Sequence, residues 1–478
     1  MKTLRFKIEN ENYLSHLIRK YFLNNSEVLE LNLKPDKNFT LQTETAIRAS
    51  ILSKQRLLSL GDRQKIEKET DALKEYQATV QNVEVLPKLT IKDIQVEVPR
   101  TGYSIESIKK TPVMFVEGQF NGLRTLRLFI DISDISEGLL PYVNILEHFF
   151  GELGTKSLRY DDFNEALCQV ADGISVSTEK YPHPTQSDQF MHFLSVKISC
   201  LDRNIDKALS LLTSLLVEPD LKDTARLSQL IQMTASDLSH SLVENAVSYA
   251  MHASAIGFDY LGSRANEYSD TQFKLNLAKT CLKSSDLKIV LEDLAFHMDF
   301  LLKKLFQKGK LKICVHTDNK KGMGKEIKKM LTALEQEYTP EVFERSLSPR
   351  LFVIPSNTIY VIETFKTPIL TEKDSPTVQV LSQLLTWIFL YPLIRGEGGA
   401  YGAGCSVSRE GRSSFYSYRD PNSLSTFSHF ETGIQGVARG HFAQEDLDAA
   451  KLALFSKLDS TTKDRDKLVQ FFLTGFSD

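Results

Sequence analysis

The chain lacks the patterns that mark several common classes of protein. Its five cysteines are odd in number and scattered among 478 residues with no Cys-x-x-Cys pair, which favours reduced core thiols over a disulfide scaffold or a cysteine-based zinc site. A net charge of -3 gives no polyanion-binding signature, and no apolar run approaches the ~20 residues of a membrane span. No targeting peptide is visible at the N-terminus. We therefore expect neither a nucleic-acid nor a membrane partner.

Histidine spacing excludes the common catalytic zinc motifs. No two of the ten histidines lie four residues apart, so neither HExxH nor HxxEH can form. One near match is Asn144-Ile-Leu-Glu147-His148, an inverted zinc-protease motif with asparagine in place of the first histidine. An amide is a poor zinc ligand, and one imidazole with one carboxylate falls short of the usual three ligands. The alternative to a metal site is a structural helix on which Glu147 and His148 face solvent or a neighbour.

Length and composition predict a globular protein of more than one domain. Hydrophobic residues make up 42% of the chain and charged residues 25%, enough for substantial cores. The order strand, helix, strand hairpin and helices occurs over residues 111–305 and again over 306–478. We therefore expect an α+β fold of two homologous domains, each a mostly antiparallel sheet with helices on one face. Helical periodicity over 41–80, punctuated at Gly61-Asp62, predicts a helical hairpin that precedes them.

Both ends of the chain suggest a part of a longer protein. Residues 28–35 alternate as a strand does, yet nothing upstream could supply the sheet that it would join. The chain ends over residues 472–478, inside or just after an apolar segment and with no polar tail. We expect residues 1–40 to be the end of a truncated preceding domain, residues 41–110 to be the hairpin and a linker, and the final domain to be incomplete at its C-terminus.

Ten lysines crowd residues 303–329. They could form a polyanion site or a solvated linker and helix face between the two domains. Aromatic residues do not interleave with them, so the stacking chemistry of nucleic-acid grooves is missing. The linker is the favoured interpretation.

The most informative stretch is glycine-rich and runs from Leu393 to Gly404. It separates Arg395 from Tyr401 by six residues, a spacing at which hydrogen-bond donors can converge on a developing oxyanion. A phosphate cradle is disfavoured, because the GxGxxG register is missing and the stretch follows a helix. In the structural alternative, Arg395 caps that helix and Tyr401 fills the core.

A turn is predicted at Arg419-Asp420-Pro421-Asn422. Its asparagine can cap a helix that starts at Ser423. Architecture is the favoured interpretation of this motif.

At these residues the sequence resembles the presequence proteases, a subfamily of the inverted-motif zinc metallopeptidases (peptidase family M16, subfamily C). The segments that carry the resemblance are residues 394–402, 416–422, 199–204 and 60–64. The resemblance covers nearly the whole chain but only the C-terminal half of the family's architecture. It implies a clamshell of two halves joined by a helical hairpin, here residues 41–80.

The resemblance implies a metalloendopeptidase that degrades targeting presequences and other short unstructured peptides in the mitochondrial matrix. Zn²⁺ and the general base would lie in an N-terminal half outside this chain, which alone would bind no zinc and be inactive. Arg395 and Tyr401 match the pair that stabilises the tetrahedral intermediate over the scissile peptide. Asn144, Glu147 and His148 match the zinc motif in degenerate form. The expected partners are an unstructured peptide substrate and the zinc-bearing half.

The alternative is a non-catalytic peptide-binding or assembly subunit of the same family. Three departures from the family pattern affect the comparison. Gly396 and Glu397 change the charge beside Arg395, the segment between Phe365 and Ser375 is short, and the last helices of the final domain are missing.

Overall fold

The structure is a computed structural model, which describes residues 2–79, 85–94, 102–136, 139–183, 190–255, 274, 276–280, 287–306, 309–334, 358–458 and 464–475. The chain divides into two compact units, residues 1–88 and 89–478. The first unit begins with α1 (Lys2–Asn10), α2 (Tyr13–Ile18) and the π-helix η1 (Arg19–Leu23). The strand predicted over residues 28–35 does not form, since that stretch is irregular and exposed, with no strand to pair with.

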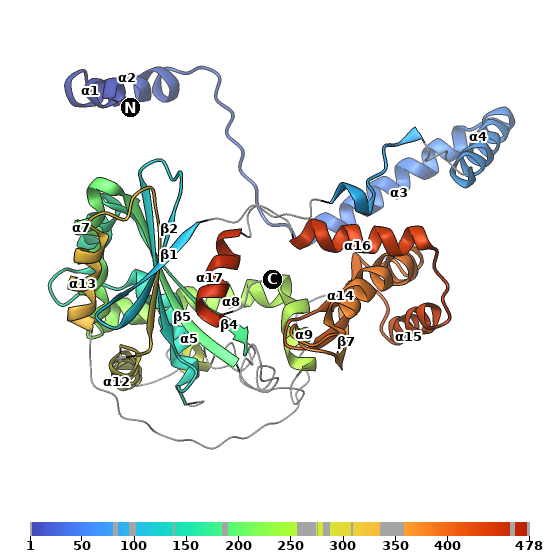
Figure 1. Ribbon diagram of the computed structural model, residues 1–478. Helices are drawn as coiled ribbons and strands as arrows, with labels where there is room; N and C mark the ends of the chain where they lie inside the picture. The colour runs from blue at the N-terminus through green and yellow to red at the C-terminus, as the bar shows by residue number, and fades with distance from the viewer. Residues whose placement is uncertain are drawn as a thin grey trace. The chain divides into compact units, whose positions relative to one another are not determined.

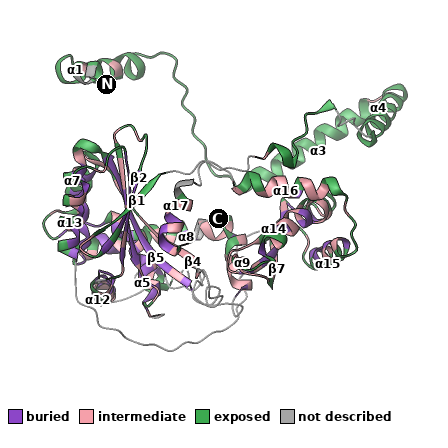
Figure 2. Cartoon of the chain, viewed as in Figure 1, coloured by how far each residue is buried: buried purple, intermediate pink, exposed green. Residues whose placement is uncertain are grey.

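The two helices predicted over residues 41–80 form as α3 (Phe39–Leu57) and α4 (Leu60–Ala78), and their pairing as a hairpin stays a prediction. The break falls at Ser59 rather than at Gly61-Asp62, because a capping box starts α4 there. The Ser59 hydroxyl accepts a hydrogen bond from the Asp62 amide at 3.1 Å, and the Asp62 carboxylate accepts one from the Ser59 amide at 3.0 Å. Neither helix has a buried residue, and both are green in Figure 2.

A six-stranded sheet organises the first part of the second unit (Figure 1). Its order is β1-β2-β6-β3-β5-β4, and only the β2–β6 pair is parallel. The strands are β1 (Tyr103–Ile108), β2 (Thr111–Glu117), β3 (Leu123–Asp131), β4 (Ala171–Pro182), β5 (Phe190–Leu201) and β6 (Leu311–Thr317). One face packs on helices α5 (Leu140–Phe149), α6 (Tyr160–Cys168), α7 (Ile205–Val217), α8 (Thr224–Glu244), α12 (Leu287–Leu305) and α13 (Met323–Leu334).

Alternation along the strands separates the two faces of this sheet. Leu126 and Leu128 of β3 point to the helical layer, whereas Phe129 points to the opposite face. That opposite face packs on the C-terminal helix α17 (Asp464–Thr474), which contributes Phe472 to a separate apolar cluster. The α+β class is therefore confirmed, with one helix added on the face that the sequence suggested would be bare.

The domain boundary predicted at residues 305/306 is wrong. Strand β6 lies between β2 and β3, with Val315 opposite Leu126, so the chain returns to complete the first sheet after residue 310. Helix α13 then packs on α7 of the same domain. A long stretch of chain lies between β5 and β6. A periodic pattern predicts that a strand forms but does not indicate which strands it pairs with.

The lysine-rich stretch is consequently part of the first domain rather than a linker. Among its described lysines, two lie at the end of α12, Lys312 lies in β6 and three lie in α13. Lys312 of β6 donates a hydrogen bond to the carbonyl oxygen of Leu473 at 2.7 Å, which ties the central strand to the end of α17. Burial lowers the pKa of Lys312. Lys310 pairs with Asp134 at 2.6 Å.

A three-stranded antiparallel sheet of order β7-β9-β8 follows, from β7 (Ile359–Lys366), β8 (Gly402–Val407) and β9 (Arg412–Asp420). Between β7 and β8, α14 (Ser375–Leu384) continues into the π-helix η6 (Leu385–Glu397). Helices α15 (Leu424–Ala438) and α16 (Gln444–Leu458) come after the sheet, and α15 packs against η6.

One helical segment of this second sheet domain differs from the sequence expectation. Residues Ser375–Glu397 are long and apolar enough to cross a membrane by length and composition, with a mean hydropathy of 1.5. The segment buries Leu385, Leu390 and Ile394 in the core of the sheet. Packing against that core accounts for those apolar side chains.

Candidate functional site

The degenerate zinc motif, Asn144-Ile-Leu-Glu147-His148, lies on α5, a helix that packs in the core. Ile145, Leu146 and Phe149 are each 1% exposed and form part of the core under the six-stranded sheet. Asn144 and His148 lie one turn apart on another face of the helix.

A lysine occupies the space between these two side chains. The ammonium of Lys274 lies 3.0 Å from Oδ1 of Asn144 and 3.3 Å from Nδ1 of His148. The Lys274 side chain is buried, with 6% of its surface exposed. His148 therefore faces a neighbour, which was one of the two outcomes expected of a structural helix.

This arrangement does not fit a zinc ion. Partial burial and the positive charge of Lys274 both lower the pKa of His148, so the imidazole is neutral, but the atoms that would face a metal already contact an ammonium. Among the residues that the structure describes, no group of three or more histidine, cysteine, aspartate or glutamate side chains could hold a metal ion. Lys274 is 126 residues from His148 in the chain, and no sequence pattern signalled their contact.

Arg395 and Tyr401 come together beside the second sheet. Arg395 lies in the last turn of η6, and Tyr401 precedes β8. The guanidinium carbon of Arg395 lies 5.7 Å from the centre of the Tyr401 ring and 5.0 Å from that of Tyr391. Tyr401 is 63% exposed, so the structural alternative in which it fills the core is wrong.

Two glycines make the tight turn between Arg395 and Tyr401 possible. Gly399 has a φ of 77°, in the left-handed region that favours glycine, and its amide donates to the Arg395 carbonyl at 3.2 Å. A Cβ on Gly398 would lie 2.6 Å from the Ile394 carbonyl oxygen. The glycines therefore close the end of the helix.

Residues at the end of β9 hold this turn through hydrogen bonds. The Tyr401 amide donates to the Tyr418 carbonyl at 3.0 Å, and the Asn422 side-chain amide donates to the Gly398 carbonyl at 2.6 Å. The predicted helix cap at Asn422 is wrong, because its side chain is used for this bridge and α15 starts at Leu424. The buried Asp420 carboxylate instead accepts hydrogen bonds from the Asn422 amide at 2.8 Å and from the Thr426 hydroxyl at 2.7 Å.

The geometry leaves strong donors facing outward. Within the ranges that the structure describes, Arg395 makes no salt bridge, and its guanidinium rests on aromatic rings with its N–H groups available. A phenol hydroxyl from Tyr401 adds another donor on the same exposed surface. Such a pair can bind a carbonyl oxygen and stabilise negative charge that develops on it.

The sequence interpretation missed the residues that extend this pair. Tyr391 and Trp387 lie four and eight residues before Arg395, and their rings are 5.3 Å apart. On the other side, the Arg419 guanidinium carbon lies 5.8 Å from the centre of the Tyr401 ring. The spacing of four residues along the helix was the available signal, because it places side chains on neighbouring turns.

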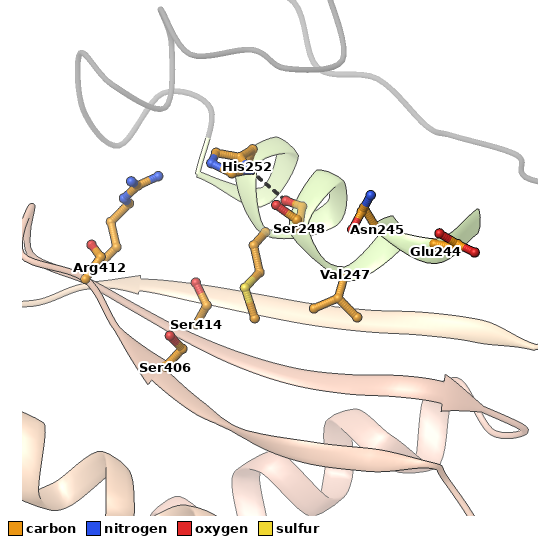
Figure 3. A pocket seen from close by; sticks show the side chains of 10 residues that line it. Glu244, Asn245, Val247, Ser248, His252, Ser406, Arg412 and Ser414 are labelled. Atoms are coloured by element: carbon orange, nitrogen blue, oxygen red, sulfur yellow. Dashed lines mark hydrogen bonds between the residues drawn. The ribbon is translucent and has the colours of Figure 1, made fainter. Parts of the chain in front are cut away.

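A separate hollow of about 410 Å³ lies between the end of α8, α9 (Ala246–Ser254) and the strands β8 and β9. Figure 3 shows His252 and Arg412 toward one end of it and Glu244 toward the other. Nδ1 of His252 lies 2.8 Å from the Ser248 carbonyl oxygen, in its own helix. The Ser414 hydroxyl is 2.9 Å from that of Thr364. The Ser254 hydroxyl lies 2.5 Å from that of Thr364, which joins α9 to β7.

Comparison with protein families gives two matches. The family model for the domain associated with subfamily C of peptidase family M16 matches residues 33–275, and "PreP C-terminal domain" matches residues 350–474. Among curated proteins, the presequence protease, mitochondrial, of Danio rerio is 28% identical over 98% of this chain and 48% of its own length. The protein of the same name from Mus musculus is 26% identical over 98% of this chain and 49% of its own length. The chain spans about half the length of these relatives.

Solved structures show the same fold at low identity. A peptidase M16 inactive domain from Pseudomonas fluorescens superposes with a TM-score of 0.55 at 15% identity, covering 79% of this chain and 87% of its own. A conserved protein from Enterococcus faecalis superposes with a TM-score of 0.57 at 12% identity, covering 78% of this chain and 89% of its own.

Proposed function

Because this chain belongs to subfamily C of the M16 peptidases and corresponds to the C-terminal half of the presequence proteases, we propose that it completes the active site of a zinc metalloendopeptidase. In this proposal the zinc and the general base belong to a separate N-terminal half. The substrates are targeting presequences and other short unstructured peptides, and the compartment is the mitochondrial matrix, in line with the mitochondrial names of the relatives.

The observation that carries the proposal is the exposed pair Arg395 and Tyr401. The two residues flank one turn, which is closed by Gly398 and Gly399 and bridged by Asn422. In the proposed complex they donate hydrogen bonds to the scissile carbonyl oxygen as it becomes an oxyanion. A donor that is fixed beforehand does not need to reorganise when the charge develops, which is why such groups lower activation barriers.

The helical hairpin supports a two-part protein. Ile47 and Ile51 of α3 are 55% and 59% exposed, and Ile66 and Leu73 of α4 are 47% and 54% exposed. These side chains lie on the apolar faces that the periodicity predicted, yet the first unit does not cover them. Apolar faces of this kind suit a docking surface for the other half of the clamshell.

The test is reconstitution. The purified chain, a zinc-bearing N-terminal half and their mixture are each assayed for cleavage of an unstructured basic peptide. We expect turnover in the mixture only, and its loss on Arg395→Ala or Tyr401→Phe. Turnover by this chain alone would overturn the proposal. Binding of the peptide without turnover in the mixture would favour the alternative, a non-catalytic peptide-binding or assembly subunit.

A further inference from the structure

The surface beside Arg395 continues as a row of stacked side chains. We name Trp387, Tyr391, Arg395 and Tyr401 the aromatic row. Each member contacts the next: the two rings at 5.3 Å, then Arg395 over Tyr391 at 5.0 Å and over Tyr401 at 5.7 Å. The row therefore joins the proposed oxyanion donors to an indole two turns earlier in the helix.

Trp387 is the open end of this row. It is the single tryptophan of the chain, and 55% of its surface is exposed. An isolated exposed apolar side chain needs no explanation, but this one contacts Tyr391, whose ring also carries the Arg395 guanidinium. Tryptophan is also among the residues most enriched at binding hot spots.

We propose that Trp387 and Tyr391 form a subsite that binds an aromatic side chain of the peptide substrate. The inference rests on the proposed function, because Arg395 marks the scissile bond. Eight helical residues span at most about 12 Å. An extended peptide advances about 3.3 Å per residue, so the bound side chain lies about three or four residues from that bond.

The charges and rings of the aromatic row favour an aromatic side chain of the peptide over a basic or an aliphatic one. The guanidinium carbons of Arg395 and Arg419 lie 5.7 and 5.8 Å from the centre of the Tyr401 ring, so the row carries positive charge at one end. A basic peptide side chain docked on the row would be repelled by these two cations. An aromatic ring carries no charge and gains from edge or offset contact with an indole beyond its area burial. We expect a preference of about 3- to 10-fold over an aliphatic ring of the same size.

Because Trp387 is the only tryptophan, its fluorescence reports on this subsite in the isolated chain. Extended peptides that differ at one position, carrying phenylalanine, cyclohexylalanine or lysine, are titrated while tryptophan emission is recorded. The variable position is moved along the peptide on both sides of the scissile bond. We expect the phenylalanine peptide to change the emission and to bind most tightly. Equal affinities for the three peptides would overturn the proposal, as would unchanged emission with all of them.

Variants separate the subsite from other roles of this surface. Binding of labelled peptides to Trp387→Ala should lose the aromatic preference, and Trp387→Phe should keep it. In the reconstituted mixture, Trp387→Ala should raise KM for the phenylalanine peptide and leave kcat unchanged. If Trp387→Ala instead weakens assembly with the zinc-bearing half and leaves the peptide preference intact, the surface is a docking face and the subsite proposal fails.

Failure of the proposed function has a different signature. Normal kcat in Arg395→Ala would remove the oxyanion role, whatever Trp387 binds. A lost aromatic preference in Trp387→Ala alongside normal kcat in Arg395→Ala would keep the subsite and discard the catalytic assignment.

Discussion

Two side-chain cations in this protein lie in opposite surroundings. The Lys274 ammonium is 6% exposed and contacts Asn144 and His148 within 3.3 Å, whereas the Arg395 guanidinium is exposed and rests on the rings of Tyr391 and Tyr401. A buried cation must be paired with polar groups, and those partners are then no longer available to a ligand. A guanidinium on aromatic rings keeps its N–H donors for a ligand. The contacts of Lys274 therefore favour a structural role for the motif on α5, and the chemistry that we propose for this chain lies at the second sheet.

The largest effect expected concerns the exposed site. Arg395→Ala should lower kcat in the reconstituted mixture about 10²- to 10³-fold, because it removes a preorganised oxyanion donor. The initial rate at saturating peptide measures this. Arg439→Ala is the matched control, since Arg439 is exposed at the end of α15 and away from the turn. If both variants reduced kcat equally, the exposed Arg395 would have no specific catalytic role, and its contrast with the buried Lys274 would not explain function.

The next largest effect expected is on stability, at the buried Asp420 that follows the turn of the exposed site. Asp420→Ala should lower the free energy of unfolding by about 2 to 3 kcal/mol, because the 1%-exposed Thr426 hydroxyl loses its 2.7 Å acceptor. Urea unfolding monitored by circular dichroism measures it. Asp446→Ala is the control, since that carboxylate accepts from the exposed Ala443 amide at 2.8 Å and its loss should cost about 1 kcal/mol or less. Equal costs would show that burial does not distinguish the two aspartates.

A third experiment attempts to convert the degenerate motif on α5 into a metal site. The double variant Asn144→His with Lys274→Met restores a histidine and removes the ammonium at similar side-chain length. We expect weak zinc binding, because two imidazoles one helical turn apart then lie beside a space without a competing cation. Isothermal titration with zinc measures it, and Asn144→His alone is the control. Equal zinc affinity in the single and double variants would show that Lys274 does not block the site.

The smallest effect expected is electrostatic. His148 should titrate below the usual range, because partial burial and, to a lesser degree, Lys274 lower its pKa. Lys274→Met should raise this pKa while leaving it below about 6.5. NMR titration measures it, with His148→Gln identifying the signal. No change in the pKa would exclude an interaction with Lys274.

The lowered pKa of His148 also makes the stability of the folded chain depend on pH. A histidine with a depressed pKa in the folded state binds fewer protons than it does in the unfolded chain, so stability falls as the pH drops from about 6.5 through the folded-state pKa. Lys274→Met should reduce this loss. Urea unfolding at a pH on each side of that range provides the measurement.

Local patterns in the sequence predicted much of this structure. The strand hairpin expected within residues 111–305 forms as β4 and β5, and helical spacing identified α3 and α4. The spacing of Arg395 and Tyr401 identified the exposed site, because only a short turn separates them. Each of these features depends on residues close together in the chain.

The features that were missed depend on distant residues. Strand β6 completes the first sheet from beyond residue 310, and Lys274 reaches His148 across 126 residues. Periodicity could not identify either partner, since a strand or a buried lysine looks the same in sequence whichever element it meets.

By itself, the sequence determined the α+β class, the helices α3 and α4 and the family resemblance, and it singled out Arg395 and Tyr401 as the pair on which the proposed function rests. The tertiary structure alone decided which strands share a sheet, that an ammonium fills the degenerate motif, and that Trp387 extends the exposed site. The physical reason is range. Backbone conformation and amphipathic faces follow from neighbouring residues, whereas burial of a charge and the pairing of strands depend on segments that only folding brings together.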